Sequence, residues 1–237
     1  MRRLRFGFKL FIAGIATALV VISAKILPQT PPAPIEPIIT QPTQPATTQP
    51  TTTQPAPDTG YLVLVNRDHA VSAEDFQDFL VRAWPTVPVS AIYDVYLHKT
   101  ALQAIAEMFD SARTAGISGL FVSSGFRGYD HQRELYENPA NQGFALPPGH
   151  SEHHTGLAAD ILIAGIGMHE MADTQEGRWL AENSHRYGLI LRYPRGAEAL
   201  TGIGFEPWHF RYVGREAAYY MFKNNLVLEE YIELLMR

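Results

Sequence analysis

The sequence predicts an α+β fold for residues 60–237, behind an apolar N-terminal segment and a proline-rich linker. Hydrophobic residues make up 46% of the 237-residue chain, which is enough for a folded core. Helical and strand patterns follow each other without strict βαβ alternation, which favours α+β over a doubly wound parallel sheet. The chain has no cysteine, which excludes a disulfide scaffold, a thiolate metal site and a cysteine nucleophile.

Residues 1–27 form the first region. Four basic residues precede an uncharged apolar run over positions 10–24: Arg2, Arg3, Arg5 and Lys9. Such a basic flank keeps the N-terminus in the cytoplasm and directs the residues that follow outward. We expect an uncleaved helix that spans a membrane once or, alternatively, a cleaved signal peptide. Both interpretations place the remainder of the chain outside the cytoplasm.

Residues 28–59 form the second region, a linker that contains 10 of the 17 prolines and otherwise mostly Thr, Gln and Ala. Proline removes backbone donors and favours extended polyproline II conformations, so we expect no packed core here. The segment is predicted to be a disordered stalk that holds the following domain away from a membrane.

The third region, residues 60–237, has the length of an ordinary single domain. The predicted strands cover 61–65, 120–122, 157–163, 189–193 and 208–213, and the predicted helices cover 100–115, 129–137, 173–187, 215–223 and 228–236. The strands are apolar runs, and the first long helix has its apolar residues on one face between a capping Thr100 and a stop at Gly116. Residues 173–176 have capping-box character, and Gly188 ends the helix that they begin.

The charge distribution separates the two ends of the chain. The whole sequence has a formal net charge of −5, whereas residues 60–237 contain 14 basic and 22 acidic residues and reach −8. An acidic domain without a basic stripe argues against nucleic acid as a partner.

The stretch Ser151–Asp160 is the first cluster with chemical character, and it runs from a Pro/Gly loop into a predicted strand. His153 and Asp160 are seven residues apart, so a straight strand would point them to opposite faces. A turn at Gly156 would let both converge on one metal ion, and an imidazole and a carboxylate are good zinc ligands. Taken alone, the pair could equally form a surface hydrogen bond.

The stretch Glu206–His209 is the second cluster. His209 offers a third metal ligand, and Glu206 can reach water at the same site without binding metal itself. Hydrolysis at a three-ligand zinc needs this combination of an open position and a carboxylate base. Pro207 restricts Glu206 to extended backbone, which limits where its carboxylate points. Alone, the stretch could also be a strand with a buried Trp208 and a capping glutamate.

The stretch Ser123–Gln132 is the third cluster, in which a buried strand leads through a glycine turn and Arg127 into a helix. An arginine at such a corner can pair with a carboxylate or stabilise an oxyanion. A structural ion pair is the alternative for this segment in isolation.

Taken together, the three clusters match ordered motifs of one family. The pattern S-x-H-x-x-G-x-A-x-D is present as Ser151, His153, Gly156, Ala158 and Asp160. E-P-W-H follows at positions 206–209, and S-G-F-R precedes at 124–127, with Gln132 five residues after the arginine. Over about residues 95–215, the chain resembles the VanY-type D-alanyl-D-alanine carboxypeptidases, zinc metallopeptidases of the bacterial cell wall.

This resemblance implies a small antiparallel sheet that is flanked by helices and carries the metal. It also implies that His153, Asp160 and His209 bind one zinc ion and that Glu206 is the general base. Arg127 would stabilise the developing oxyanion or hold the substrate, and Gln132 and Ser151 would line the pocket for the C-terminal end of the peptide.

The expected reaction is removal of the C-terminal D-alanine from peptidoglycan stem peptides. Two alternatives remain open: an L,D-carboxypeptidase on the same scaffold that trims tetrapeptide stems, and a non-catalytic zinc-bearing module that binds the cell wall. The expected location is the extracytoplasmic face of a bacterial membrane, or the cell wall after secretion. No oligomeric state follows from the sequence.

Overall fold

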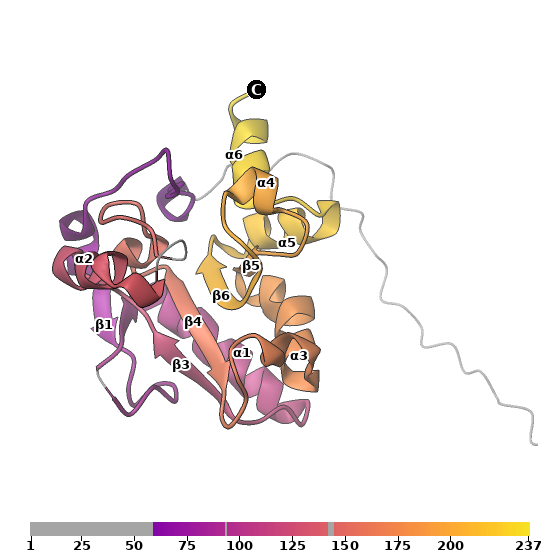
Figure 1. Cartoon of the computed structure of the whole chain (residues 1–237). Helices are drawn as coiled ribbons and strands as arrows, with labels where there is room; N and C mark the ends of the chain where they lie inside the picture. The colour runs from indigo at the N-terminus through magenta and orange to yellow at the C-terminus, as the bar shows by residue number, and fades with distance from the viewer. Residues whose placement is uncertain (1–58, 93, 142–144) are drawn as a thin grey trace, which may run out of the picture. The chain divides into compact units, whose positions relative to one another are not determined.

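Four antiparallel strands form the main sheet of the fold, in the spatial order β3-β4-β6-β5 (Figure 1). The structure is a computed structural model that describes residues 59–92, 94–141 and 145–237. The predicted N-terminal segment and almost all of the predicted linker lie outside these residues. None of the helices in the described ranges is both long and apolar enough to cross a membrane.

The elements expected from residue 100 onward are present in the expected order, whereas the two short strands before residue 99 and the short helix over 198–201 were not predicted. The strands are β1 (Leu80–Arg82), β2 (Tyr96–His98), β3 (Leu120–Ser124), β4 (Ala158–Ile163), β5 (Leu189–Tyr193) and β6 (Glu206–Tyr212), with β1 and β2 forming a separate two-stranded sheet. The helices are α1 (Lys99–Thr114), α2 (Tyr129–Glu137), α3 (Gln175–Asn183), α4 (Glu198–Thr201), α5 (Arg215–Asn224) and α6 (Leu228–Leu235). The predicted α+β fold with a small antiparallel sheet and flanking helices is therefore confirmed.

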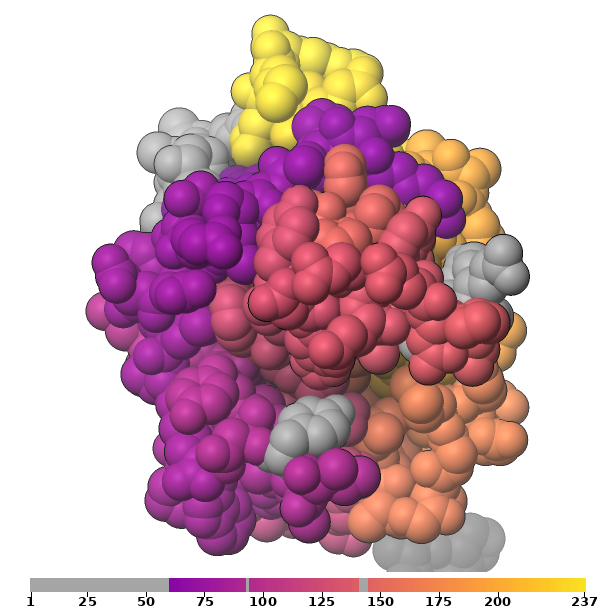
Figure 2. Space-filling model, turned by 60° about the vertical axis from the view of Figure 1, so that its left-hand side comes forward, coloured from indigo at the N-terminus to yellow at the C-terminus, as the bar shows by residue number. Residues whose placement is uncertain are grey.

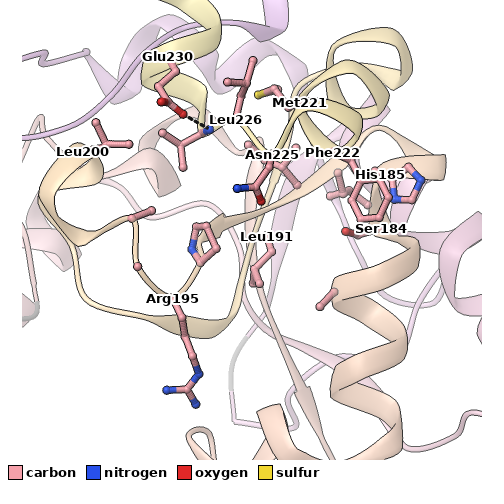
Figure 3. A pocket seen from close by; sticks show the side chains of 17 residues that line it. Ser184, His185, Leu191, Arg195, Leu200, Met221, Phe222, Asn225, Leu226 and Glu230 are labelled. Carbon is pink, nitrogen blue, oxygen red and sulfur yellow. Dashed lines mark hydrogen bonds between the residues drawn. The ribbon is translucent and has the colours of Figure 1, made fainter.

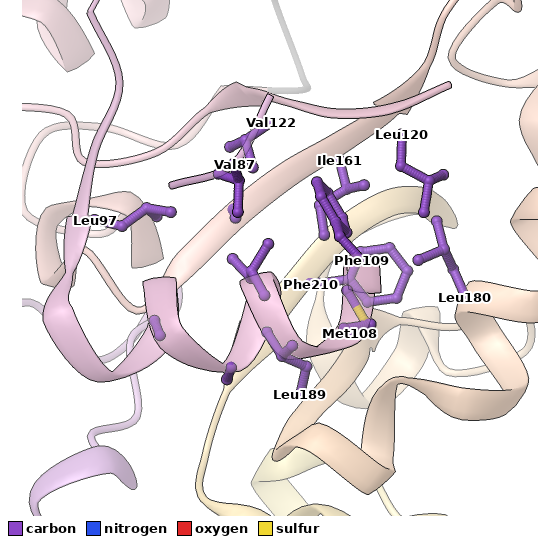
Figure 4. Close-up of a cluster of buried hydrophobic side chains, with 14 of the residues drawn as sticks. Val87, Leu97, Met108, Phe109, Leu120, Val122, Ile161, Leu180, Leu189 and Phe210 are labelled. Carbon is purple, nitrogen blue, oxygen red and sulfur yellow. The ribbon is translucent and has the colours of Figure 1, made fainter. Parts of the chain in front are cut away.

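The main sheet has one apolar and one polar face, because successive residues of a strand point to opposite sides. On the apolar face, Ile161 and Phe210 pack with Met108 and Phe109 of α1 into the main core, as Figure 4 shows. On the polar face, Asp160, His209 and Arg211 are buried. The helix on one side of the sheet thus leaves the other side for polar groups.

Helix α1 forms because its apolar residues recur at helical spacing on the face that meets the sheet, and five of them are almost fully buried: Ala101, Ile105, Met108, Phe109 and Ala112. Its N-terminal cap is His98, whose Nδ1 accepts a hydrogen bond from the backbone nitrogen of Thr100 at 3.2 Å. The prediction of Thr100 as the cap was therefore wrong by two positions, since an imidazole acceptor takes the place of the expected hydroxyl.

A smaller core lies under the C-terminal helices. Ile190 of β5 packs there with Met221 of α5 and with Leu228 and Tyr231 of α6. This core attaches α6 to the edge of the main sheet, close to the polar face of β5.

Three local predictions need correction. The run 61–65 is not a strand: Tyr61 ends a short 3₁₀ turn, and the backbone carbonyls of Tyr61 and Val63 accept hydrogen bonds from the Arg211 side chain instead. Strand β6 begins at Glu206 rather than at 208. The helix expected over 173–187 is α3 followed by a 3₁₀ turn (Ser184–Tyr187), capped by Thr174, which accepts a hydrogen bond from Gly177 N at 3.0 Å.

Candidate active site

Strand register brings the first two candidate ligands together. Asp160 of β4 and His209 of β6 lie directly opposite each other in the antiparallel ladder, so their side chains share one face of the sheet. Asp160 Oδ1 lies 3.1 Å from His209 Nδ1. Two residues that are far apart in the sequence are thus neighbours because β4 pairs with β6.

A 3₁₀ turn, η4 (Glu152–Thr155), positions the third candidate ligand. His153 lies on this turn, which ends at Gly156 in the left-handed conformation with φ +66°. A β-carbon at Gly156 would come within 2.5 Å of Leu80 Cδ2 and 2.9 Å of the His98 backbone nitrogen, so glycine is required there for both reasons. The turn expected at Gly156 is present, and it puts His153 Nε2 3.4 Å from Asp160 Oδ1.

His153, Asp160 and His209 each offer one ligand atom within 4.8 Å of the others, and among the described residues they are the one such group of three or more. The backbone carbonyl of Gly125 lies 2.6 Å from His153 Nδ1. Because a carbonyl only accepts, Nδ1 carries the proton and Nε2 keeps its lone pair. That Nε2 is buried without a hydrogen-bond partner, as expected for an atom that binds a metal.

His209 is oriented in the opposite sense. Its Nε2 lies 3.3 Å from Oε2 of Glu152, a buried carboxylate, so Nε2 donates and Nδ1 faces Asp160. His209 Nδ1 and the Asp160 carboxylate oxygen are close enough to share either a proton or a metal ion. Burial opposes a charge on His209, but the hydrogen bonds with Asp160 and Glu152 outweigh it and raise the pKa of the imidazole to about 9. The pocket thus favours a positive charge, which a zinc ion also supplies.

Glu206 lines the same pocket as the three candidate ligands. Its Oε2 lies 3.8 Å from His209 Nδ1. Glu206 and His209 are three residues apart, so on a regular strand their side chains would point to opposite faces. The pairing of β5 with β6 is irregular at this point: the register shifts between Leu191 and Tyr193, and Tyr193 pairs with Glu206. Burial raises the pKa of Glu206 to about 7. The negative charges of Asp160 and Glu152 add to this rise, and the positive charges of His209 and Arg127 offset only part of it.

Arg127, Gln132 and Ser151 lie in the wall of this pocket as well. Arg127 Nη1 donates to Gln132 Oε1 at 2.9 Å, and Gln132 Nε2 donates to the Leu146 carbonyl at 2.7 Å. Arg127 Nη2 also lies 3.5 Å from Asp160 Oδ2. Gln132 holds the Arg127 guanidinium in place, and because Gln132 is almost fully buried, little of its own surface is open to a ligand. All seven residues predicted for the site therefore meet in one pocket.

The sequence analysis missed two residues of the site. Glu152 is fully buried behind His209, between Arg192 and Arg211. Tyr193 lines the pocket, and its ring centroid is 4.9 Å from that of His209. One feature of the sequence could have indicated Glu152: it is a charged residue directly before the candidate ligand His153, in a segment with few other charged residues.

The next histidine, His154, has a structural role. Its Nε2 accepts a hydrogen bond from Gly149 N at 2.9 Å and its Nδ1 donates to the Arg127 carbonyl at 2.6 Å. These contacts hold the loop before the site against the segment that carries Arg127. Figure 2 shows this side of the molecule, where salmon residues that follow position 125 lie between the indigo residues after position 58 and the orange residues beyond 165.

The family model described as VanY: D-alanyl-D-alanine carboxypeptidase matches residues 94–215, a range that contains every site residue named above. The chain belongs to this family. The D-alanyl-D-alanine carboxypeptidase of Enterococcus faecium is 37% identical to the VanY-family chain over 181 residues, which cover 74% of this chain and 58% of that protein. The chain thus spans less than two thirds of that relative's length.

Two solved structures extend the likeness of this VanY-family chain to three dimensions. The LdcB LD-carboxypeptidase, whose structure reveals the molecular basis of peptidoglycan recognition, is 37% identical with a TM-score of 0.66, and the match covers 72% of this chain and 84% of that one. A mutant of the vancomycin-resistance D,D-pentapeptidase VanY in complex with Zn(II) is 33% identical with a TM-score of 0.59, and the match covers 73% and 98%.

Proposed function

We propose that this VanY-family chain is a zinc-dependent D,D-carboxypeptidase that removes the C-terminal D-alanine from peptidoglycan stem peptides. The observation that carries the proposal is a single pocket in which three metal-binding groups lie within 4.8 Å of one another and Glu206 and Arg127 line the wall. A related D,D-pentapeptidase that binds Zn(II) and the carboxypeptidase of E. faecium support the choice of metal and reaction.

Zinc held by His153, Asp160 and His209 supplies Lewis-acid chemistry, which polarises a carbonyl and lowers the pKa of water. Glu206 accepts a proton from the water that attacks the peptide carbonyl. It returns this proton to the nitrogen of the leaving D-alanine as the C–N bond breaks. The products are D-alanine and a stem peptide one residue shorter. Burial raises the pKa of Glu206 to about 7 in the pocket without a cation, and a cation at the three metal-binding groups would lower it toward the ionised form that accepts a proton.

Arg127 supplies the positive charge on the protein side of the pocket. Its guanidinium either donates to the carbonyl oxygen as negative charge develops or binds the C-terminal carboxylate of the peptide. The hydrogen bond with the buried Gln132 holds it in place before substrate arrives, so little reorganisation is needed during the reaction. Ser151 lines the same pocket and offers a hydroxyl to the peptide end.

An L,D-carboxypeptidase is the second candidate, because the LdcB LD-carboxypeptidase is 37% identical to this chain over the matched region. The same metal-binding groups, base and arginine serve both reactions. The two activities differ in the configuration of the residue before the scissile bond, which the pocket wall selects. A cell-wall-binding module without catalysis is disfavoured, since binding alone has no need of Glu206 beside the metal-binding groups.

We place the enzyme outside the cytoplasm, where peptidoglycan lies. The support is in the sequence: basic residues at positions 2–9 followed by an apolar run over 10–24, and then a proline-rich segment long enough to act as a stalk. Protease treatment of intact spheroplasts tests this, because a domain outside the membrane is digested without lysis. Protection until lysis would contradict the proposed location.

The substrate test uses the full-length chain loaded with zinc. D-alanine release is measured from a pentapeptide stem that ends in D-alanyl-D-alanine and from the matching tetrapeptide stem. We expect release from the pentapeptide, loss of activity after chelation and recovery on adding Zn²⁺. Release from the tetrapeptide alone would establish the L,D activity instead. No release from either peptide at full zinc content would refute both.

A further inference from the structure

A buried carboxylate, Glu152, lies behind the candidate metal ligand His209, and its two oxygens have different partners. Oε1 accepts hydrogen bonds from Arg192 Nε at 2.7 Å and from Arg211 Nη1 at 2.9 Å. Oε2 lies 3.3 Å from His209 Nε2. The side chains of Glu152, Arg192 and Arg211 are all 0% exposed, so these contacts are shielded from solvent. Glu152 holds His209 with one oxygen while the two guanidinium groups hold the other.

These contacts continue to the C-terminal helix. Arg192 donates through Nη1 and Nη2 to the two carboxylate oxygens of Glu229 on α6, at 2.9 and 2.6 Å. A bidentate pair of this kind fixes the plane of the guanidinium as well as its position. Glu229 lies beyond residues 94–215, the range that the family model matches. A chain of direct contacts thus leads from α6 to the metal site.

We propose that Glu229 is a positioning residue for the metal site and acts on His209 through Arg192 and Glu152. The inference rests on the proposed function in one respect, namely that His209 binds zinc. Partners that orient a metal-binding histidine through its outer nitrogen typically change metal affinity by about 10- to 100-fold when they are lost. Glu152 is such a partner by direct contact, and Glu229 keeps Glu152 available for the task.

The need for Glu229 follows from the donors of Arg192. Its Nε uses Glu152, and its two terminal nitrogens use Glu229. Without the Glu229 carboxylate, these nitrogens would be buried donors that lack an anionic acceptor, which is unfavourable. We expect the guanidinium then to turn toward Oε2 of Glu152 and to compete with His209 for that oxygen.

Two other glutamates of α6 have different surroundings. Glu230 accepts a hydrogen bond from Val227 N at 3.0 Å and borders a separate pocket with Leu226 and Met221, on the side of α6 that Figure 3 shows. Glu233 pairs with Arg237 at the surface, where both side chains are 69% exposed. Glu233→Gln is therefore a matched control, since it makes the same chemical change on the same helix without a contact to Arg192.

The test compares full-length wild type, Glu229→Gln and Glu233→Gln. The thermal unfolding midpoint reports folding, competition with a chromophoric chelator gives the Zn²⁺ dissociation constant, and D-alanine release gives kcat and KM. We expect Glu229→Gln to raise the Zn²⁺ dissociation constant by about tenfold or more and to leave KM nearly unchanged. Glu233→Gln should match wild type. A lower midpoint for Glu229→Gln with an unchanged dissociation constant would mean a merely structural role and would overturn the proposal.

Arg192→Lys is the second variant, and it decides the matter if Glu229→Gln does not fold. Lysine keeps the charge but cannot donate to both carboxylates in the same plane. We expect Arg192→Lys alone to weaken Zn²⁺ binding as well. Where Glu229→Gln folds, adding it to Arg192→Lys should cause no further loss. An unchanged dissociation constant, or two losses that simply multiply, would overturn the route through Arg192. A wild-type chain that binds no zinc would refute the proposed function together with this inference, whereas normal wild-type binding with an unchanged Glu229→Gln refutes the inference alone.

Discussion

Asp160 and His209 lie opposite each other on β4 and β6, with Asp160 Oδ1 and His209 Nδ1 3.1 Å apart. The opposite nitrogen of this imidazole faces Glu152, so the ring is held between two carboxylates. Strand register therefore places two of the three candidate ligands, and a short 3₁₀ turn adds His153 as the third.

Glu206→Gln removes the proposed proton carrier but keeps the size of the side chain. Because general acid–base groups typically contribute about 10²–10⁴-fold, we expect kcat to fall by that amount with zinc content and unfolding midpoint unchanged. Glu176→Gln, on α3, is the control and should retain wild-type kcat. A Glu206→Gln enzyme with full turnover would show that another group is the base.

His209→Ala removes one of three proposed zinc ligands. We expect the purified protein to contain much less zinc than wild type, as measured by metal analysis after dialysis. His131→Ala is the matched control because His131 is an exposed residue of α2. Equal zinc in His209→Ala and wild type would remove His209 from the ligand set.

Arg127→Ala removes the positive charge from the wall of the pocket. Loss of one preorganised donor to a developing oxyanion typically lowers turnover about 10²–10³-fold, so we expect kcat/KM to fall by this order. Zinc content should stay near one ion per chain, since Arg127 is not among the candidate ligands. Arg133→Ala, an exposed arginine of α2, should behave as wild type. Unchanged kinetics in Arg127→Ala would refute the assigned role.

Gly125→Ala tests the packing beneath the site. A β-carbon at Gly125 would come within 2.3 Å of the Tyr96 carbonyl and 2.9 Å of Val95 Cγ1, and the Gly125 carbonyl also fixes the tautomer of His153. Overpacking of this kind typically lowers the free energy of unfolding by about 1–3 kcal/mol. Gly128→Ala is the control, because nothing lies within 4 Å of its built β-carbon. Urea unfolding measures both variants, and equal stability would contradict the close approach at Gly125.

Much of the fold was predictable because the patterns are local. The helix that became α1 and the strands 189–193 and 157–163 have periodicity and stops within a few residues. The run 61–65 has the composition of a strand but belongs to neither sheet in the described part of the chain, and the carbonyls of Tyr61 and Val63 accept hydrogen bonds from Arg211 instead. Local composition could not distinguish these two outcomes.

The candidate metal-binding residues were predictable because their types and their spacing within short motifs can be read directly from the sequence. The role of Glu152 and its arginines was not predictable, because the contacts join positions 152, 192, 211 and 229, which are far apart in the sequence. The one local hint is that Glu152 stands directly beside the candidate ligand His153. Burial of a charge is a property of the folded chain. A sequence pattern shows the ligands of such a site more readily than the groups that hold them.

A crystal structure of the zinc-loaded chain, with anomalous data collected at the zinc edge, tests the central claim most directly. The result that we predict is one ion bonded at about 2.0–2.2 Å by His153 Nε2, a carboxylate oxygen of Asp160 and His209 Nδ1, with Glu206 close by but outside bonding distance. Zinc bound elsewhere, or bonded by the His209 nitrogen that faces Glu152, would contradict the account.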